Sequence, residues 1–204
     1  MYVGYIYQNN QVHGLTNSST IKGALDQWYQ DYLATKYGDM IDGNAGFCGD
    51  REPSTSSTAS NGSGGTGTTE TYYGAYIRLL GNNKVLTFEC KNESDLYTIS
   101  GSEEGNNALT YPIGLINLDE AAYAGGVWGS SNQSYYLYTK QDYWTMSPFY
   151  FYSGTAYVFY VTANGNLVSY WTTSRFGIRP VINLKANVKI SSGTGTSSNP
   201  YIVN

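Results

Sequence analysis

The residues from Trp144 to Ser174 restrict the possible folds of this chain most strongly, because they include no Lys, Arg, Asp or Glu. The stretch carries ten aromatic side chains among Ser, Thr, Asn and Gly residues. A strand with one face in water normally alternates apolar with polar or charged residues, and sheet edges are usually protected by charge. This stretch is therefore either covered on both faces, or it keeps an aromatic face exposed for a ligand.

Asn164-Gly165 is the strongest short hairpin signal in the chain. A two-residue turn there places Val161 opposite Val168 and Tyr160 opposite Ser169. One face of the hairpin is then expected to carry Tyr157, Phe159, Val161, Val168, Tyr170 and Thr172. The other face is expected to carry Ala156, Val158, Tyr160, Thr162, Leu167, Ser169, Trp171 and Thr173. Neither face alternates apolar with charged residues, so both interpretations stay open.

Two helices can be predicted from capping residues and spacing. Ser18 and Ser19 are favourable N-cap residues, and the apolar residues after them recur at helical spacing. We expect a helix from about Thr20 to Lys36, with one apolar face made of Ile21, Leu25, Trp28 and Tyr32. Asn117 with Glu120 is close to a capping box, and Gly125-Gly126 is a stop signal, so a shorter helix is expected between them.

The remaining elements are expected to be strands. Tyr72–Leu80 and Val85–Cys90 flank Gly81-Asn82-Asn83, which predicts a β-hairpin. Further short strands are expected at Val3–Tyr7, Val181–Leu184, Val188–Ile190 and Tyr201–Val203. This order of strands and helices is typical of an α+β fold.

The bulk composition narrows the domain organisation and the partners. A chain of 204 residues is expected to form a single domain over 1–204. The eleven basic residues form no cluster, which argues against nucleic acid or anionic lipid as a partner. No apolar stretch approaches the ~20 residues needed for direct membrane insertion. The start, Met1 to Gly4, lacks a secretion signal, so the protein is either intracellular or a trimmed domain. We favour trimming, because the start resembles the inside of a strand.

Cys48 and Cys90 are the only cysteines, and they are either two buried free thiols or one disulfide. The tract from Pro53 to Thr71 between them is almost wholly Ser, Thr, Gly and Asn, so it is expected to be a flexible loop. A bridge across the base of this loop would stabilise the fold by roughly 4 kcal/mol. We favour the bridge, which implies an oxidising compartment and an extracellular or cell-surface location.

The chain offers little for catalysis or metal binding. His13 is the only histidine, so a Ser-His-Asp or Cys-His site is not expected. Asp39, Asp42 and Asn44 offer oxygen atoms, but their spacing misses the EF-hand pattern, and a solvated loop is expected. The pair Glu103-Glu104 lies in a polar loop, and Asp119-Glu120 opens the second helix. We expect no enzyme, no cofactor and no metal.

Two segments carry a family resemblance. Tyr143-Trp144-Thr145-Met146-Ser147-Pro148 and Arg175-Phe176-Gly177-Ile178-Arg179-Pro180-Val181 flank the Asn-Gly hairpin. This arrangement resembles the C-terminal half of C-type-lectin-fold domains of the formylglycine-generating-enzyme type, which end in a Gly-Phe-Arg-Pro-like strand. More narrowly, it resembles the variable proteins of diversity-generating retroelements and related bacterial and phage surface proteins. The resemblance covers about residues 110–190 and implies a C-type lectin fold with antiparallel sheets and two helices.

The resemblance also implies a function. In retroelement variable proteins, adenine-directed mutagenesis diversifies a ligand-binding segment just before the Gly-Phe-Arg-Pro-like motif. The matching positions here are Tyr150, Tyr152, Ser153, Thr155, Tyr160, Thr162, Ser169, Tyr170, Trp171, Thr172, Thr173 and Ser174. The expected partner is a protein or glycan on another cell or virus surface. No cysteine follows Cys90, so the activity of the formylglycine-generating enzymes, which needs a C-terminal cysteine pair, is not carried over.

Two further expectations remain beside this one. The uncharged aromatic strip could instead pack against a neighbouring subunit, in a structural or assembly domain of a pilus-like or other bacterial surface protein. Arg175 and Arg179 bracket the terminal motif, and we expect them to pair with a carboxylate near the sheet edge rather than to contact a ligand.

Overall fold

The fold is mixed α+β and is seen in a computed structural model that describes residues 19–54, 57–58, 62–63, 70–80, 85–152, 154–196 and 198–204. The strand expected at Val3–Tyr7, His13, Ser153 and most of the polar tract between Pro53 and Thr71 lie outside the described residues. The helices of the described part are α1 (Thr20–Tyr29), α2 (Thr35–Tyr37), α3 (Gly74–Leu80) and α4 (Leu118–Tyr123).

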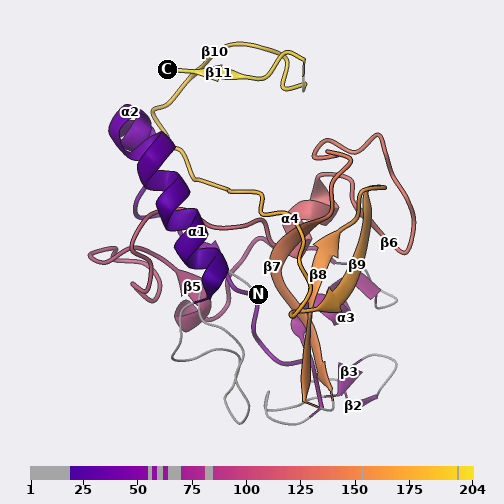
Figure 1. Cartoon of the computed structure of the whole chain (residues 1–204). Helices are drawn as coiled ribbons and strands as arrows, with labels where there is room; N and C mark the ends of the chain where they lie inside the picture. The colour runs from indigo at the N-terminus through magenta and orange to yellow at the C-terminus, as the bar shows by residue number, and fades with distance from the viewer. Residues whose placement is uncertain are drawn as a thin grey trace.

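A five-stranded sheet forms the centre of the molecule, with the order β4-β7-β8-β9-β6 (Figure 1). Its strands are β4 (Thr71–Tyr72), β6 (Val127–Trp128), β7 (Tyr143–Tyr152), β8 (Thr155–Val161) and β9 (Asn166–Trp171). All its pairs are antiparallel except β6 with β9, which is parallel, so the expectation of purely antiparallel sheets was wrong. Three two-stranded pairs join β1 (Phe47–Cys48) to β5 (Leu96–Tyr97), β2 (Ser57–Thr58) to β3 (Gly62–Ser63), and β10 (Ile190–Ser192) to β11 (Ile202–Val203).

The first helix begins at the expected residue, because the Ser19 hydroxyl accepts a hydrogen bond from the backbone N–H of Lys22 at 3.1 Å. It continues through a π-helical turn, Gln30–Ala34, into α2. The predicted apolar face was only half right, since Ile21 and Leu25 are buried but Trp28 and Tyr32 are exposed. The buried stripe instead follows four-residue steps along the helix through Ile21, Leu25 and Tyr29.

The hairpin predicted around residues 81–83 was wrong. Gly74–Leu80 is helix α3, which buries Ala75 and Leu79 one helical turn apart. Residues 85–90 form no strand, and Val85 and Phe88 are more than half exposed. The described part of the chain therefore has a third helical segment, α3 of seven residues, where a strand was expected, beyond the two helices that the resemblance implies.

The helix predicted near residue 118 is confirmed as α4. Asn117 accepts a hydrogen bond from the Glu120 N–H, and the Glu120 carboxylate accepts one from the Asn117 N–H, which completes a capping box. Ser147 of β7 accepts a hydrogen bond from the N–H of Leu118 at 2.9 Å. Gly125 follows the helix with φ of 110°, a conformation in which glycine is favoured. These contacts fix the N-terminus of α4 to the sheet.

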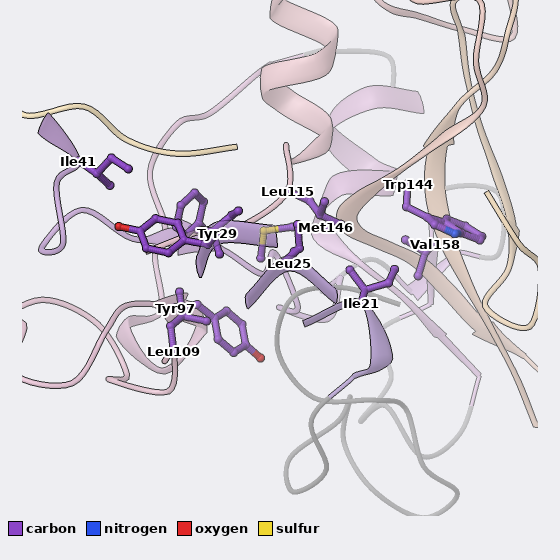
Figure 2. Packing of buried hydrophobic residues seen from close by; sticks show 12 residues of the cluster. Ile21, Leu25, Tyr29, Ile41, Tyr97, Leu109, Leu115, Trp144, Met146 and Val158 are labelled. Carbon is purple, nitrogen blue, oxygen red and sulfur yellow. The ribbon is translucent and has the colours of Figure 1, made fainter. Parts of the chain in front are cut away.

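The central strands are covered on both faces. On one face, Trp144, Met146 and Val158 pack with Ile21 and Leu25 of α1 in a buried cluster (Figure 2). The other face belongs to a second buried cluster, which is formed with residues of α3 and α4 and contains Ala75, Leu79, Leu118, Ala121, Tyr143, Phe149, Phe159, Val161 and Leu167. The double covering explains why the first half of the uncharged stretch has no charge.

The register of β8 with β9 differs by one residue from the predicted register. Val161 lies opposite Leu167, and Tyr157 lies opposite Trp171. The turn has three residues, 163–165, because the Thr162 N–H donates to the Asn166 carbonyl at 2.9 Å. Within this turn Gly165 alone takes a positive φ, of 75°, whereas a two-residue type I′ turn needs a positive φ at Asn164 as well. A one-residue slip moves every side chain of β9 to the other face. Leu167 and Trp171 therefore share a face with Phe159.

The late strands were predicted in part. The predicted strands Val188–Ile190 and Tyr201–Val203 overlap β10 and β11, and this pair lies away from the central sheet, at the top of the view in Figure 1. Val181–Leu184 forms no strand, but it makes two isolated bridges, Gly114 with Val181 and Ile41 with Leu184. The segment is extended and crosses the molecule close to the first core cluster, which Val181 and Ile182 contact.

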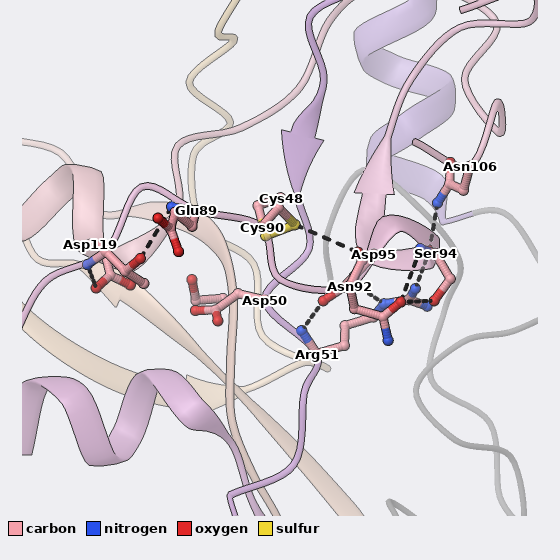
Figure 3. The surroundings of a disulfide bond; sticks show 12 residues. Cys48, Asp50, Arg51, Glu89, Cys90, Asn92, Ser94, Asp95, Asn106 and Asp119 are labelled. Carbon is pink, nitrogen blue, oxygen red and sulfur yellow. Dashed lines mark hydrogen bonds and ion pairs between the residues drawn. A yellow bond between two sulfur atoms is a disulfide. The ribbon is translucent and has the colours of Figure 1, made fainter. Parts of the chain in front are cut away.

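A disulfide joins Cys48 and Cys90, whose Cα atoms are 5.5 Å apart (Figure 3). Beside it lies an ionic cluster in which Arg78 donates to both carboxylate oxygens of Asp50 at 2.8 Å and to Asp119 at 2.6 and 3.1 Å. Asp119 is buried and also accepts the Thr87 N–H at 3.0 Å. The disulfide and Asp119 thus attach the segment 85–90 to the fold at two points.

Candidate functional site

The most distinctive surface of the molecule is a row of four aromatic rings that crosses the sheet. Tyr72 of β4, Tyr150 of β7, Tyr157 of β8 and Trp171 of β9 are successive cross-strand partners. The centroids of Tyr72 and Tyr150 are 5.3 Å apart, and those of Tyr150 and Tyr157 are 4.3 Å apart, with both pairs stacked. Trp171 meets Tyr157 edge to face at 6.2 Å. We call these four residues the aromatic row.

The aromatic row continues the second core cluster towards the surface. Tyr150 and Tyr157 are half-buried and contact that cluster, and Phe149 packs against the ring of Tyr150 at 4.7 Å. At the surface, Tyr152 and Trp171 are about half exposed. The inner rings are therefore held rigidly by the sheet, while Trp171 at one end of the row and the neighbouring Tyr152 are open to a partner.

The hydroxyls of Tyr72 and Tyr150 stay neutral. Burial, followed by the hydrogen bond with Tyr157 and the nearby tyrosines, raises the pKa of Tyr150 well above its usual value. Burial also raises the pKa of Tyr72, with further contributions from Tyr76, Glu70 and Tyr152. Each hydroxyl remains a hydrogen-bond donor and acceptor without charge at neutral pH.

A second aromatic group lies on the opposite face of the sheet. Tyr160 stacks on Phe176 at 4.3 Å, and Phe176 also contacts Trp144 at 4.7 Å and Tyr170 at 5.7 Å. Tyr160 and Phe176 are partly buried against the first core cluster, whereas Tyr170 is 43% exposed. Through these contacts, Phe176 packs the motif Arg175 to Val181 against the sheet.

The predicted ligand-binding positions do not form one surface. Tyr150, Tyr152, Thr155, Ser169 and Trp171 lie on the face of the aromatic row, by the register of β7, β8 and β9. Tyr160 and Tyr170 lie on the other face, and Thr173 is exposed just beyond β9. Thr162 stabilises the turn, since its hydroxyl accepts hydrogen bonds from Asn164 and Asn166. Thr172 and Ser174 are half-buried, with their N–H groups donated to Ala156 and Trp171 carbonyls.

Two residues of the row were not among the predicted positions. Tyr72 had been assigned to a hairpin with residues 85–90, although it pairs with β7. Tyr157 had been placed on a hairpin face but was not selected as a ligand contact. The correct register of the hairpin places Tyr157 opposite Trp171, but the predicted two-residue turn shifts that register by one residue. No residue near Tyr72 indicates that it pairs with a strand 78 positions later.

Asp42 and Asp50 are both held by hydrogen bonds within the fold. Asp42 accepts hydrogen bonds from the N–H groups of Asn44 and Ala45, which forms a local turn. Among the residues that the structure describes, no group of three His, Cys, Asp or Glu side chains is placed to hold a metal ion. Burial raises the pKa of Asp50 to about 6, and its carboxylate accepts hydrogen bonds from Arg78 in the ionic cluster. No helix in the described part of the chain is long and apolar enough to cross a membrane.

Comparison with known proteins finds one matching family. Residues 81–186 match the family described as "Domain of unknown function (DUF6273)". The chain belongs to this family. No curated protein and no solved structure matches the chain. The DUF6273 segment contains α4 and β6 to β9, and so three of the four rings of the aromatic row, while Tyr72 lies before it.

Proposed function

We propose that this DUF6273 chain is a ligand-binding domain that uses the aromatic row and its exposed neighbours as the contact surface. The observation that carries the proposal is the continuous alignment of Tyr72, Tyr150, Tyr157 and Trp171 across four strands. Rigid aromatic side chains with hydroxyl groups provide contact area at low entropic cost, as in antibody binding loops. The exposure of Trp171, at one end of the row, and of the neighbouring Tyr152 supports contact with a large partner.

The family resemblance supports a finer proposal. The domain is a C-type-lectin-fold protein of the kind found in diversity-generating retroelements, and its ligand is a protein or glycan on another cell or virus surface. Its α+β fold and the extended segment after the hairpin are compatible with that fold. The disulfide favours an oxidising, extracellular or cell-surface location. A ligand-binding role requires no catalytic residues.

The binding test compares surface variants on a printed glycan array and on intact bacterial cells. The double variant Tyr152→Ser with Trp171→Ser should lose at least about tenfold in affinity, because hot-spot aromatic residues dominate such interfaces. Tyr123→Ser is the matched control, since Tyr123 is 74% exposed but lies on α4 and contacts Phe88 instead of the row. Binding should change little between about 50 and 500 mM salt, because the row carries no charge.

Two results would count against the proposal. Equal losses in the row variant and the Tyr123 variant would show that the row is not the contact surface. Sedimentation that depends on protein concentration, abolished by Tyr170→Glu, would instead favour the assembly domain of a pilus-like surface protein. For the retroelement link, codons from Tyr143 to Val181 should be sequenced across one source population. Changes confined to adenine-derived codons would support diversification, and an invariant segment would refute it.

A further inference from the structure

Arg179 is a half-buried cation that lacks the carboxylate partner expected from the sequence. Its Nη1 donates a hydrogen bond to the Leu137 carbonyl, and its guanidinium carbon lies 5.4 Å from the centre of the Tyr143 ring. No Asp or Glu in the described part of the chain is within ion-pair distance of it. A guanidinium has five N–H donors, so most of its hydrogen-bonding capacity is available to an external acceptor.

Arg179 lines two open pockets. One pocket, of about 390 Å³, lies between α4 and the extended segment 179–182 and is lined by Ile116, Glu120, Leu137, Arg179, Pro180, Val181 and Ile182. The other, of about 300 Å³, is lined by Thr139, Gln141, Asp142, Tyr143, Gly177, Ile178 and Arg179. In the second pocket the Asp142 carboxylate already accepts the Ala163 N–H at 2.7 Å. The first pocket is the larger of the two and has the more apolar lining, so it is the better candidate for a ligand.

The lining of the first pocket combines an apolar floor with two opposite charges. Five of its residues are apolar, and the charged groups are Arg179 and Glu120. One oxygen of the Glu120 carboxylate accepts the Asn117 N–H at 2.9 Å, which fixes the side chain in the capping box. Ligand pockets typically have this form, with mainly apolar walls and a few fixed polar groups, and volumes of about 300–1,000 Å³.

We propose that this pocket binds the carboxylate of an apolar amino acid, either as the free molecule or as the last residue of a peptide. Arg179 would hold the carboxylate through its unused N–H groups, since a guanidinium matches carboxylate geometry. Ile116, Leu137 and Val181 would contact the apolar side chain. Glu120 would face the ammonium group of a free amino acid, which a peptide lacks. None of these residues belongs to the aromatic row.

The experiment uses phenylalanine, N-acetylphenylalanine and N-acetylphenylalaninamide as probes of the intact chain. In ¹⁵N-resolved NMR titrations, the two carboxylates should shift the amides of Glu120, Val181 and Ile182. The amide probe, which has the same apolar body without the carboxylate, should bind at least about tenfold more weakly. Tighter binding of phenylalanine identifies the free amino acid as the ligand form. Equal or tighter binding of N-acetylphenylalanine identifies a peptide C-terminus.

Matched variants test which part of the ligand Arg179 and Glu120 each contact. Arg179→Gln should weaken both carboxylates by at least about tenfold, whereas Arg175→Gln, which removes an exposed charge from the same segment, should have no effect. Glu120→Gln keeps the capping box and should weaken phenylalanine only. If Arg179→Gln does not fold, the comparison of acid and amide probes on the unaltered chain decides. Equal binding of acid and amide, shifts at the aromatic row alone, or no shifts at about 10 mM would overturn the proposal.

Discussion

Asp50 is expected to make the protein less stable as the pH rises from about 4 to 6. Its side chain is only 10% exposed, and burial raises its pKa to about 6 despite the charge of Arg78 and its hydrogen bonds, with a smaller upward contribution from Asp119. In the unfolded chain an Asp titrates near 3.9. Between these two values the folded protein binds more protons than the unfolded chain, so the free energy of unfolding falls as the pH increases.

The size of the effect follows from the two pKa values. A difference of about 2 units corresponds to roughly 3 kcal/mol, which is lost between pH 4 and 6 and remains lost above about pH 7. For a chain of this size, roughly 3 kcal/mol lowers the melting temperature by about 6–12 °C. Other carboxylates titrate in the same range, so the prediction concerns the difference between the protein and a variant.

Asp50→Asn is the informative variant. Asp50 has φ of 53°, a left-handed conformation that Asn tolerates as well as Asp does, so the substitution changes mainly the charge. Chemical denaturation at half-unit steps from pH 4 to 8 should show a steeper decline for the unaltered protein than for the variant. Asp39→Asn, at an exposed position, should leave the slope unchanged. A smaller decline in the unaltered protein than in Asp50→Asn would show that the ion pair with Arg78 outweighs burial, and would refute the reasoning.

Three further predictions concern stability and can be checked by chemical denaturation. Replacing Cys48 and Cys90 together by Ala should lower the free energy of unfolding by roughly 4 kcal/mol, since the bridge spans 42 positions, and equal stability under oxidising conditions would contradict this. Gly165→Ala should cost roughly 1–3 kcal/mol, because φ is 75° and a Cβ atom would lie 2.0 Å from the Asn132 carbonyl oxygen. Phe159→Ala should cost about 3–5 kcal/mol, since the ring is fully buried, and a cost below about 1 kcal/mol would place Phe159 outside the core.

The features that could be predicted from the sequence are those that neighbouring residues decide. Ser19 caps the first helix, and Asn117 with Glu120 caps α4, because both motifs act over three positions. The strands after Trp144 can also be predicted locally, because Asn164-Gly165 is a hairpin signal between aromatic and β-branched residues. Its covering on both faces requires α1 on one side and α3 with α4 on the other, which no local pattern specifies.

The features that could not be predicted depend on distant contacts. Gly165 approaches the backbone of Asn132, and a positive φ at Gly165 without one at Asn164 gives a three-residue turn instead of the expected two-residue turn. That single difference moved Trp171 to the face of the aromatic row. Tyr72 belongs to the row because it pairs with Tyr150. Arg179 contacts the Leu137 carbonyl and the Tyr143 ring instead of the expected carboxylate. Of the aromatic row, Tyr150 and Trp171 could thus be predicted from the sequence as ligand positions, whereas Tyr72 and Tyr157 could not.

The covering of the central strands on both faces limits which parts of this chain can be exchanged by recombination. The family segment 81–186 includes the strands that carry Trp144 and Phe149, but α1 and α3, which cover their two faces, come before residue 81. Transplanted alone into another protein, the segment would keep α4 but would expose to water the apolar surfaces that α1 and α3 cover. Recombination between relatives is therefore expected to keep the region from Thr20 onward together with the segment, as one exchangeable unit.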